Sequence, residues 1–211
     1  MKIKHIATVA ALGATLALSS ASAQAAVTVP GVDFTSPGSV VSSNSVWTLG
    51  YQFTANAGAT VTGLATWDSW NTAGSVEVGL WNASGNLITQ ASVSNTSATI
   101  GSADWSYTAI SPVALTAGDT YYVGSYGTAA GYTWGTSGFT VDSRINFVQD
   151  SWNYGAYGLP NQTDNLQGFF GGNVVLGGVP EASTWAMMLL GFASLGFAGY
   201  RASRKSAALA A

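Results

Sequence analysis

Apolar and polar residues alternate along several short stretches in the middle of the chain. In one of them, Val76, Val78 and Leu80 fall on one face of an extended segment. Glu77 and Trp81 fall on the opposite face. A period of two residues is typical of a β-strand that buries one face, because successive side chains point to opposite sides. The stretch therefore predicts a half-buried strand.

Stretches of the same kind occur on both sides of segments rich in Asn, Gly and Asp, which favour turns. None of them has the period of 3.6 residues that is typical of an amphipathic helix. The strands that this pattern predicts lie at 46–55, 60–67, 75–82, 87–93, 120–126 and 169–176, with a further short strand at about 112–115 before the turn at Gly118 and Asp119. Short strands at this spacing favour an all-β fold, and we expect residues 26–178 to form a β-sandwich of jelly-roll type.

The start of the chain has a different pattern, in which two lysines precede thirteen uncharged residues at 6–18 and then a run of small residues. This order predicts a signal peptide over residues 1–25, which the Sec translocon and signal peptidase would process. Ala23 and Ala25 fit the cleavage pattern, so that Ala26 begins the mature chain, and the same spacing also fits two residues earlier. A permanent anchor helix is the alternative, but this segment is shorter than the about 20 residues that span a bilayer.

The end of the chain contains a second uncharged segment at 185–200, and Arg201, Arg204 and Lys205 follow it closely. A buried core helix is the alternative, but such a helix is rarely apolar around its whole circumference. Positive residues beside a membrane segment stay in the cytoplasm. We therefore expect a transmembrane helix at 184–200, which the three basic residues stop in the membrane, and a cytoplasmic tail at the last six positions.

A short motif precedes this helix. Val179, Pro180, Glu181 and Ala182 are followed by a Trp, a Gly-containing apolar stretch and the basic residues. Together, residues 179–205 resemble the PEP-CTERM sorting signal of exported proteins in Gram-negative bacteria that make extracellular polysaccharide. The chain departs from the family pattern at Ala182, where the Pro-Glu-Pro motif of the family usually has its second Pro. The resemblance implies that exosortase, a membrane protease-transpeptidase, recognises the motif and removes the tail.

The middle of the chain has a resemblance of its own, over about residues 46–127. It resembles an uncharacterised β-sandwich domain of secreted, often carbohydrate-associated bacterial proteins, for which no active site is known. The positions that carry this resemblance are Phe53, Thr54, Val61, Thr62, Gly63, Leu80, Trp81, Leu115, Gly118 and Tyr121.

The charge of the body argues against one class of partner. Arg144 is the only basic residue between Ala26 and Gly178, against eight acidic residues, which gives this part a net charge of −7. Such a surface repels phosphate backbones, so we expect no binding of nucleic acid.

Few residues of the body suit catalysis. The chain has no cysteine, and its one histidine, His5, lies in the predicted signal peptide. A mature chain without His or Cys lacks the base of a Ser-His-Asp triad and the usual ligands of zinc. A glycoside hydrolase needs two carboxylates across a cleft, but Glu77 is the only Glu of the body and lies on a predicted strand. We expect no enzymatic activity and no cofactor, with a cryptic glycoside hydrolase as an alternative that requires a pair of Asp residues.

Calcium is a further alternative, because the second half of the body is rich in oxygen ligands. Asp and Asn also cap turns, and no loop of the EF-hand type joins these residues, so turn roles are the interpretation that we favour. The residues are Asp142, Asp150, Asp164, Asn146, Asn161 and Asn165.

Aromatic residues among Gly and Asn form the last candidate site, with Trp134, Trp152, Tyr154 and Tyr157 as its members. Such rings can stack on the apolar C–H faces of sugars, while amide side chains hydrogen-bond the hydroxyl groups. These rings can instead pack beneath a long loop, where large aromatic residues are usually found, and this is the interpretation that we favour.

The sequence thus predicts an exported protein without catalytic activity, held transiently in the inner membrane and then located at the cell surface or outside the cell. We expect it to associate with exopolysaccharide or biofilm matrix. A carbohydrate-binding module is the main alternative.

Overall fold

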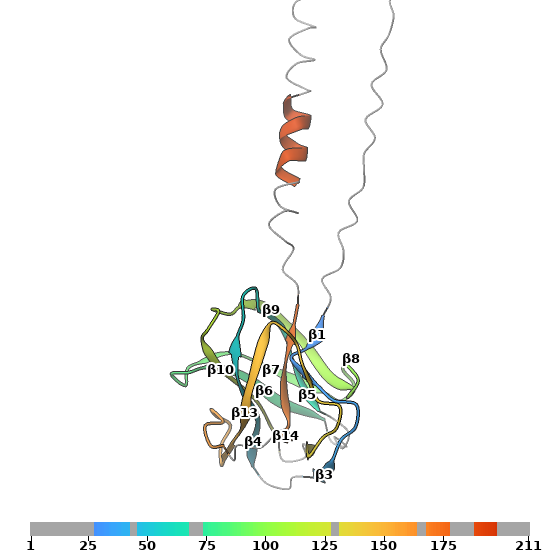
Figure 1. The fold of residues 1–211 in the computed structure, drawn as a ribbon, viewed down its shortest axis with the longest axis vertical. Helices are drawn as coiled ribbons and strands as arrows, with labels where there is room; N and C mark the ends of the chain where they lie inside the picture. Colours follow the sequence, from blue (N-terminus) through green and yellow to red (C-terminus); the bar gives the residue numbers. More distant parts are fainter. Residues whose placement is uncertain are drawn as a thin grey trace, which may run out of the picture.

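The structure is a computed structural model, which describes residues 28–42, 46–67, 74–127, 131–163, 168–177 and 188–197. The described part is mostly β-strand, as predicted, and all of its strand pairs are antiparallel (Figure 1). Two five-stranded sheets make up most of the body, and two smaller sheets complete it.

The first sheet has the order β1-β15-β5-β9-β8. Its strands are β1 (Val29–Pro30), β15 (Gly172–Leu176), β5 (Thr60–Trp67), β9 (Trp105–Ala114) and β8 (Thr99–Ile100). The second sheet has the order β13-β4-β10-β6-β7. Its strands are β13 (Ile145–Tyr154), β4 (Trp47–Ala55), β10 (Thr120–Tyr126), β6 (Ser75–Asn82) and β7 (Leu87–Ser94).

The two smaller sheets lie near the ends of these strands. One has the order β14-β11-β3, with β14 (Gly168–Phe170), β11 (Gly131–Trp134) and β3 (Ser39–Ser42). The other pairs β12 (Thr140–Val141) with β2 (Val32–Asp33).

The predicted strands are present, with one correction at the last of them. The stretch predicted as a single strand at 169–176 is divided into β14 and β15, which belong to different sheets. The chain changes sheets at Gly171, where a Cβ atom would lie only 2.6 Å from the Ser125 Oγ and 2.9 Å from the Leu49 carbonyl oxygen. The sequence pattern could not reveal this break, because the stretch reads as one short, mostly apolar run with no charged residue in it.

The inward faces of the two large sheets share one hydrophobic core. Tyr51 and Phe53 of β4 and Val78 of β6 are fully buried there, together with Leu64 of β5 and Val174 of β15. The alternation predicted for β6 is confirmed, since its apolar face points into this core. Burial of such side chains is the main source of stability for a chain of this size.

The outward position predicted for Trp81 needs a second correction, because its side chain is only 3% exposed. The ring of Tyr157 lies 5.4 Å from it, between ring centroids. Tyr157 belongs to the segment that follows β13, which folds back over the outer face of the second sheet and places Pro160 against Gly124. The outer face of this sheet is therefore partly covered by a loop and is not fully exposed to solvent.

A buried polar network joins the two large sheets. The Tyr51 hydroxyl donates to the Asn173 Oδ1 at 2.6 Å, and the Asn173 side-chain amide donates to the Val32 carbonyl at 2.8 Å. The Val32 N–H in turn donates to the same Oδ1 at 3.3 Å. Burial raises the pKa of Tyr51 well above its usual range, so the hydroxyl stays a neutral donor.

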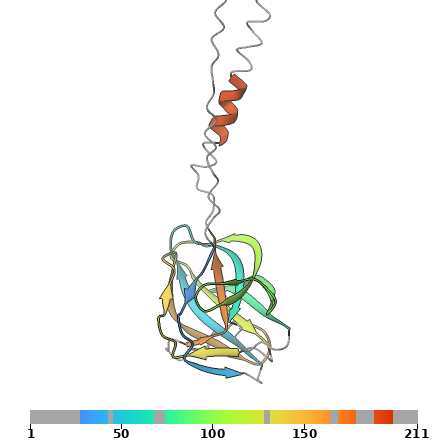
Figure 2. The same cartoon turned by 90° about the vertical axis from the view of Figure 1, so that its right-hand side faces the viewer.

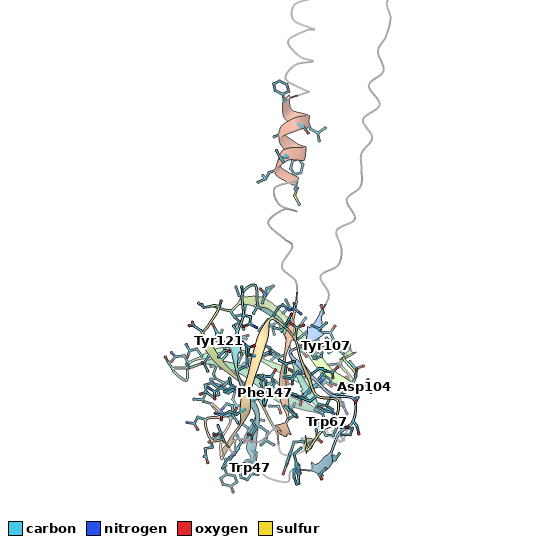
Figure 3. All side chains as sticks on the ribbon, in the orientation of Figure 1. Trp47, Trp67, Asp104, Tyr107, Tyr121 and Phe147 are labelled. Carbon is cyan, nitrogen blue, oxygen red and sulfur yellow. The ribbon has the colours of Figure 1, made fainter. Side chains whose placement is uncertain are left out.

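Both ends of the body leave from the same side. Val29 pairs with Leu176, and the Gly177 N–H donates to the Thr60 carbonyl at 3.1 Å, beside the turn that joins β4 to β5. Figures 1 and 2 show β1 and β15 side by side at this end in two views. Strand β4 runs from Trp47 to Ala55, and Ala55 is close to this end of the body. Trp47 therefore lies at the other end, about 26 Å away, because a strand rises by about 3.3 Å per residue. Figure 3 labels Trp47 at the end of the body opposite to β1.

Residues 188–197 form a helix with exposed side chains. It lies within the predicted transmembrane segment at 184–200, whose remaining residues are outside the described part. Among the residues that the structure describes, no helix has the length and apolar character needed to cross a membrane.

Candidate functional site: an aromatic cluster opposite the chain ends

Three aromatic rings gather where β4 begins and β13 ends. In the register of these strands Trp47 pairs with Tyr154, and Leu49 pairs with Trp152. The ring centroid of Trp47 lies 4.7 Å from that of Tyr154 and 5.3 Å from that of Trp152. The planes are inclined by 61° and 66°, which is the edge-to-face geometry that aromatic pairs prefer. We call Trp47, Trp152 and Tyr154 the aromatic cluster.

The position of the cluster along the strands explains its exposure. Alternation places Trp47 on the same face of β4 as Leu49 and Tyr51, which is the face that forms the core. Gly171, just before β15, lies against Leu49, and Trp47 is two residues beyond that contact. Tyr154 is accordingly 61% exposed, while Trp47 and Trp152 are half-buried.

The segment after β13 forms one wall of the cluster. The chain turns at Gly155, which has a φ of 115° and whose N–H donates to the Val46 carbonyl at 2.8 Å. It then returns and pairs with β13, because Trp152 and Gln162 exchange both backbone hydrogen bonds, at 2.8 and 2.9 Å. The side chains of Asn161 and Gln162 are exposed beside the half-buried Trp152.

The surroundings of the cluster are uncharged in this part of the structure. The residues that pair with it or flank it by backbone bonds are Val46, Thr48, Asn153, Gly155 and Gln162. The acidic residue that lies two positions before Trp152 in β13, Asp150, is fully buried. The indole N–H of Trp152 is buried and has no hydrogen-bond partner among the described residues.

Tyr157, which the sequence groups with these rings, has a different position. Its ring packs on Trp81 and lies 5.8 Å from the ring of Tyr126. Its hydroxyl lies over Gly79, where any Cβ atom would clash with it. Burial raises the pKa of Tyr157, and the negative charge of Glu77 adds to the shift. Tyr157 thus fixes the loop to the sheet, as the packing alternative predicted.

Trp134 is exposed, at 46%, but lies on β11 in the three-stranded sheet. The structure therefore brings together two of the four rings predicted as a sugar-binding site, Trp152 and Tyr154. It adds Trp47, which the sequence alone did not single out. Only the register of β4 against β13, strands about 100 positions apart, places Trp47 beside Tyr154.

The oxygen ligands considered for calcium are used in other ways where the structure describes them. Asp142 forms an ion pair with Arg144, with 2.7 Å between the Oδ1 and the Nε. The Asn146 amide donates to the Asn56 Oδ1 at 2.8 Å. Asp150 is fully buried on the inner face of β13, whereas Asn161 is exposed in the segment after that strand. Within the described ranges, no three His, Cys, Asp or Glu side chains are grouped so that they could hold a metal ion.

Several predicted site residues lie outside the part of the chain that the structure describes. They are Ala23, Ala25 and Ala26 of the cleavage site, Val179, Pro180, Glu181 and Ala182 of the sorting motif, the basic Arg201, Arg204 and Lys205, and Asp164 and Asn165.

A polar cavity of about 460 Å³ lies beside the turn before β9. Asp104 lines it and has a left-handed backbone, with a φ of 54°. The turn is held by Asp33, whose carboxylate accepts the N–H groups of Ser102 and Ala103 and the indole N–H of Trp105, at 2.7, 3.1 and 3.3 Å. Asp104 is the only carboxylate among the described residues that line this cavity, whereas a glycoside hydrolase requires two.

The sequence of the body matches one known protein family. A family model described as a domain of unknown function, DUF4082, matches residues 33–171, which is well over half of the chain. The chain belongs to the DUF4082 family. The DUF4082 match includes all three rings of the aromatic cluster and extends on both sides of 46–127. No curated protein and no solved structure matches the chain.

Proposed function

We propose that this DUF4082 protein is an exported, non-catalytic β-sandwich that exosortase sorts to the cell surface or the extracellular matrix, where it associates with exopolysaccharide. In this proposal the segment at 1–25 is a signal peptide and the segment at 179–205 is a PEP-CTERM sorting signal. The second segment holds the protein in the inner membrane only until it is processed.

The observation that carries this proposal is the pairing of the strands next to the two signals. Val29 and Leu176 are partners in one sheet, so both sequence signals join the body at the same end. A body attached in this way points its opposite end, with Trp47, away from the attachment. Removal of either terminal segment would also leave the ten strands of the two large sheets intact.

The strand order supports the finer description of the fold as a jelly roll. The four-stranded order β1-β15-β5-β9 and the order β4-β10-β6-β7 are those of the two sheets of a jelly roll, when these strands are numbered along the chain. In this description β13 is an additional strand at the edge next to β4, and β8 is an addition next to β9.

The state of the carboxylates supports a non-catalytic role. Asp33 and Asp142 line one cavity of about 290 Å³. The Asp33 oxygens accept three N–H groups, and Asp142 is paired with Arg144. These partners hold both carboxylates toward groups of the protein itself, and, although burial opposes it, the hydrogen bonds and charge of Arg144 lower the pKa of Asp142, which does not suit a general acid.

The experiment is to produce the full chain in a Gram-negative host that has exosortase and to measure the intact mass of the protein recovered from the surface and the medium. We expect a chain that begins at Ala26 and lacks residues 185–211. A protein that still begins at Met1 would contradict export, and an intact tail would contradict sorting.

Two variants separate the roles of the tail. Glu181→Ala changes the motif and leaves the apolar segment and the basic residues unchanged, so we expect export without removal of the tail. Neutral replacement of Arg201, Arg204 and Lys205 should instead let the tail pass the membrane, because each charge costs about 2.5–3.5 kcal/mol at a helix centre. Protease accessibility of the tail distinguishes these two outcomes.

A further inference from the structure

We propose that the aromatic cluster of Trp47, Trp152 and Tyr154 binds a single chain of an uncharged polysaccharide. The inference deepens the proposed function and rests on its association with exopolysaccharide, because it names the surface and the class of ligand. It does not depend on how either end of the chain is processed.

The rings of the cluster are accessible as a group. Tyr154 is 61% exposed, and the half-buried Trp47 lies between it and Trp152. Sugar rings carry apolar C–H faces, so an exposed aromatic face removes apolar surface of the sugar from water. The packing of Trp47 against both neighbours fixes the rings before a ligand arrives, which lowers the entropy cost of binding.

The inclination of the rings selects the form of the ligand. Their planes differ by 61° and 66° at the two contacts, so the cluster is not a flat platform. A crystalline polysaccharide presents a flat face and would contact only one ring at a time. A single chain can twist and place successive sugar units on differently inclined rings.

The polar groups around the rings suit hydroxyls rather than charges. The exposed amides of Asn161 and Gln162 can both donate to and accept from hydroxyl groups. The only basic residue of the body, Arg144, precedes β13 at the end of that strand away from Tyr154, so an acidic polysaccharide has no cation to meet here.

The extent of the patch argues against a protein partner. Three aromatic side chains bury about 150–250 Å² each when fully covered, and two of these three are already half-buried. The available area is therefore on the order of 400 Å², well below the about 800 Å² that each partner buries in a stable protein interface. A polysaccharide needs no such area, because many weak sites along one polymer act together.

The experiment is a calorimetric titration of the full chain, purified in lauryldimethylamine oxide, a detergent without a sugar headgroup. The polymers are soluble mixed-linkage glucan, galactomannan, dextran and the exopolysaccharide purified from the producing host. Alginate serves as the acidic polymer, and sedimentation with microcrystalline cellulose tests a flat surface. We expect binding to at least one neutral soluble polymer and none to alginate or crystalline cellulose.

The variants assign the binding to the cluster. Tyr154→Ala and Trp47→Ala should each raise the Kd by about tenfold, which corresponds to roughly 1.4 kcal/mol for one lost ring contact. Tyr154→Phe should restore binding, because it keeps the ring. Trp134→Ala is the control, since it removes another exposed ring, which lies on a different sheet, and should bind as the wild type does.

Several results would overturn the inference. They are no binding to any neutral polymer, an unchanged Kd in both Tyr154→Ala and Trp47→Ala, or loss of binding in Trp134→Ala alone. Self-association of the full chain that Tyr154→Ala abolishes would instead identify a protein interface. Binding by calorimetry and processing by intact mass are read separately, so that either proposal can fail while the other stands.

Discussion

Two groups of aromatic rings in this protein have the same chemistry and opposite surroundings. Phe34 packs against Trp67, Trp105 and Phe170, with centroid distances of 5.6–6.0 Å, and none of the four side chains is more than 3% exposed. In the aromatic cluster, Tyr154 is 61% exposed although its contact with Trp47 is closer, at 4.7 Å. Ring packing alone therefore does not distinguish a structural group from a surface group.

The difference lies in what covers the rings and what satisfies their polar atoms. The indole N–H of Trp105 donates to Asp33, whereas that of Trp152 has no partner among the described residues. The Phe34 group lies between elements of several sheets, and the aromatic cluster lies at the end of two strands. We expect the first group to contribute mainly to the free energy of unfolding and the second mainly to ligand binding.

The largest effect on stability should come from Trp105→Ala, which removes a fully buried ring and leaves a cavity beside Phe34. We expect the free energy of unfolding to fall by about 3–5 kcal/mol, the usual cost of removing a buried aromatic ring. Urea denaturation of residues 26–178, followed by circular dichroism, measures it. A loss below about 1 kcal/mol would mean that the Phe34 group is not the core that its burial indicates.

A smaller effect should follow from Asn173→Ala, which removes the side chain at the centre of the polar network. The Tyr51 hydroxyl, the Val32 N–H and the Val32 carbonyl would lose their partner inside the core. We expect a loss of about 1–3 kcal/mol, the cost of leaving buried polar groups unsatisfied. Tyr51→Phe removes only one of these bonds, so it should cost less in the same denaturation. An equal cost for both variants would show that Tyr51 and not Asn173 organises the network.

The sequence was sufficient to predict several strands of the core, but it predicted neither the long strand β13, nor most of the long strand β9, nor the surface site. Strand β6 was predictable because the period of two extends over all of Val76, Val78 and Leu80. The burial of Trp81 was not, because it depends on Tyr157, a residue in a distant loop. Trp47 was missed for the same reason, since local alternation cannot give the register between β4 and β13. The packing of Tyr157 agrees with the interpretation favoured from the sequence, but the composition of the loop could not show which of the rings turn inward.

Acid should remove a further, modest part of the stability at the end of the body that carries β1. Burial by itself would raise the pKa of Asp142, but hydrogen bonds from the Arg144 side chain and backbone and its positive charge outweigh it, so the pKa lies below 3.8. A carboxyl group with a lowered pKa in the folded state stabilises the protein above its unfolded pKa. This contribution is lost as the pH falls through the lower, folded value.

We expect at most about 1 kcal/mol from this pair, because it is partly exposed and screened by water. The measurement is the urea midpoint of residues 26–178 at about pH 7 and about pH 3, compared with Asp142→Asn. The variant should show a smaller decrease between the two pH values than the wild type. Identical decreases would place the acid sensitivity in other carboxyl groups.

The smallest effect on stability should come from Tyr154→Ala, the variant that is expected to weaken sugar binding most directly. Its side chain is 61% exposed and contacts mainly Trp47, so its removal uncovers little buried surface. Surface substitutions of this kind change the free energy of unfolding by within about 0.5 kcal/mol. Denaturation in urea gives the stability of this variant, and titration of the full-length variant with a neutral polysaccharide gives its affinity.

A loss of stability near that of Trp105→Ala would mean that Tyr154 is part of the core, and the contrast between the two ring groups would then be wrong. A stable variant with weakened binding would instead separate the two groups by function, since the same ring chemistry would support the fold in the core and the ligand at the surface.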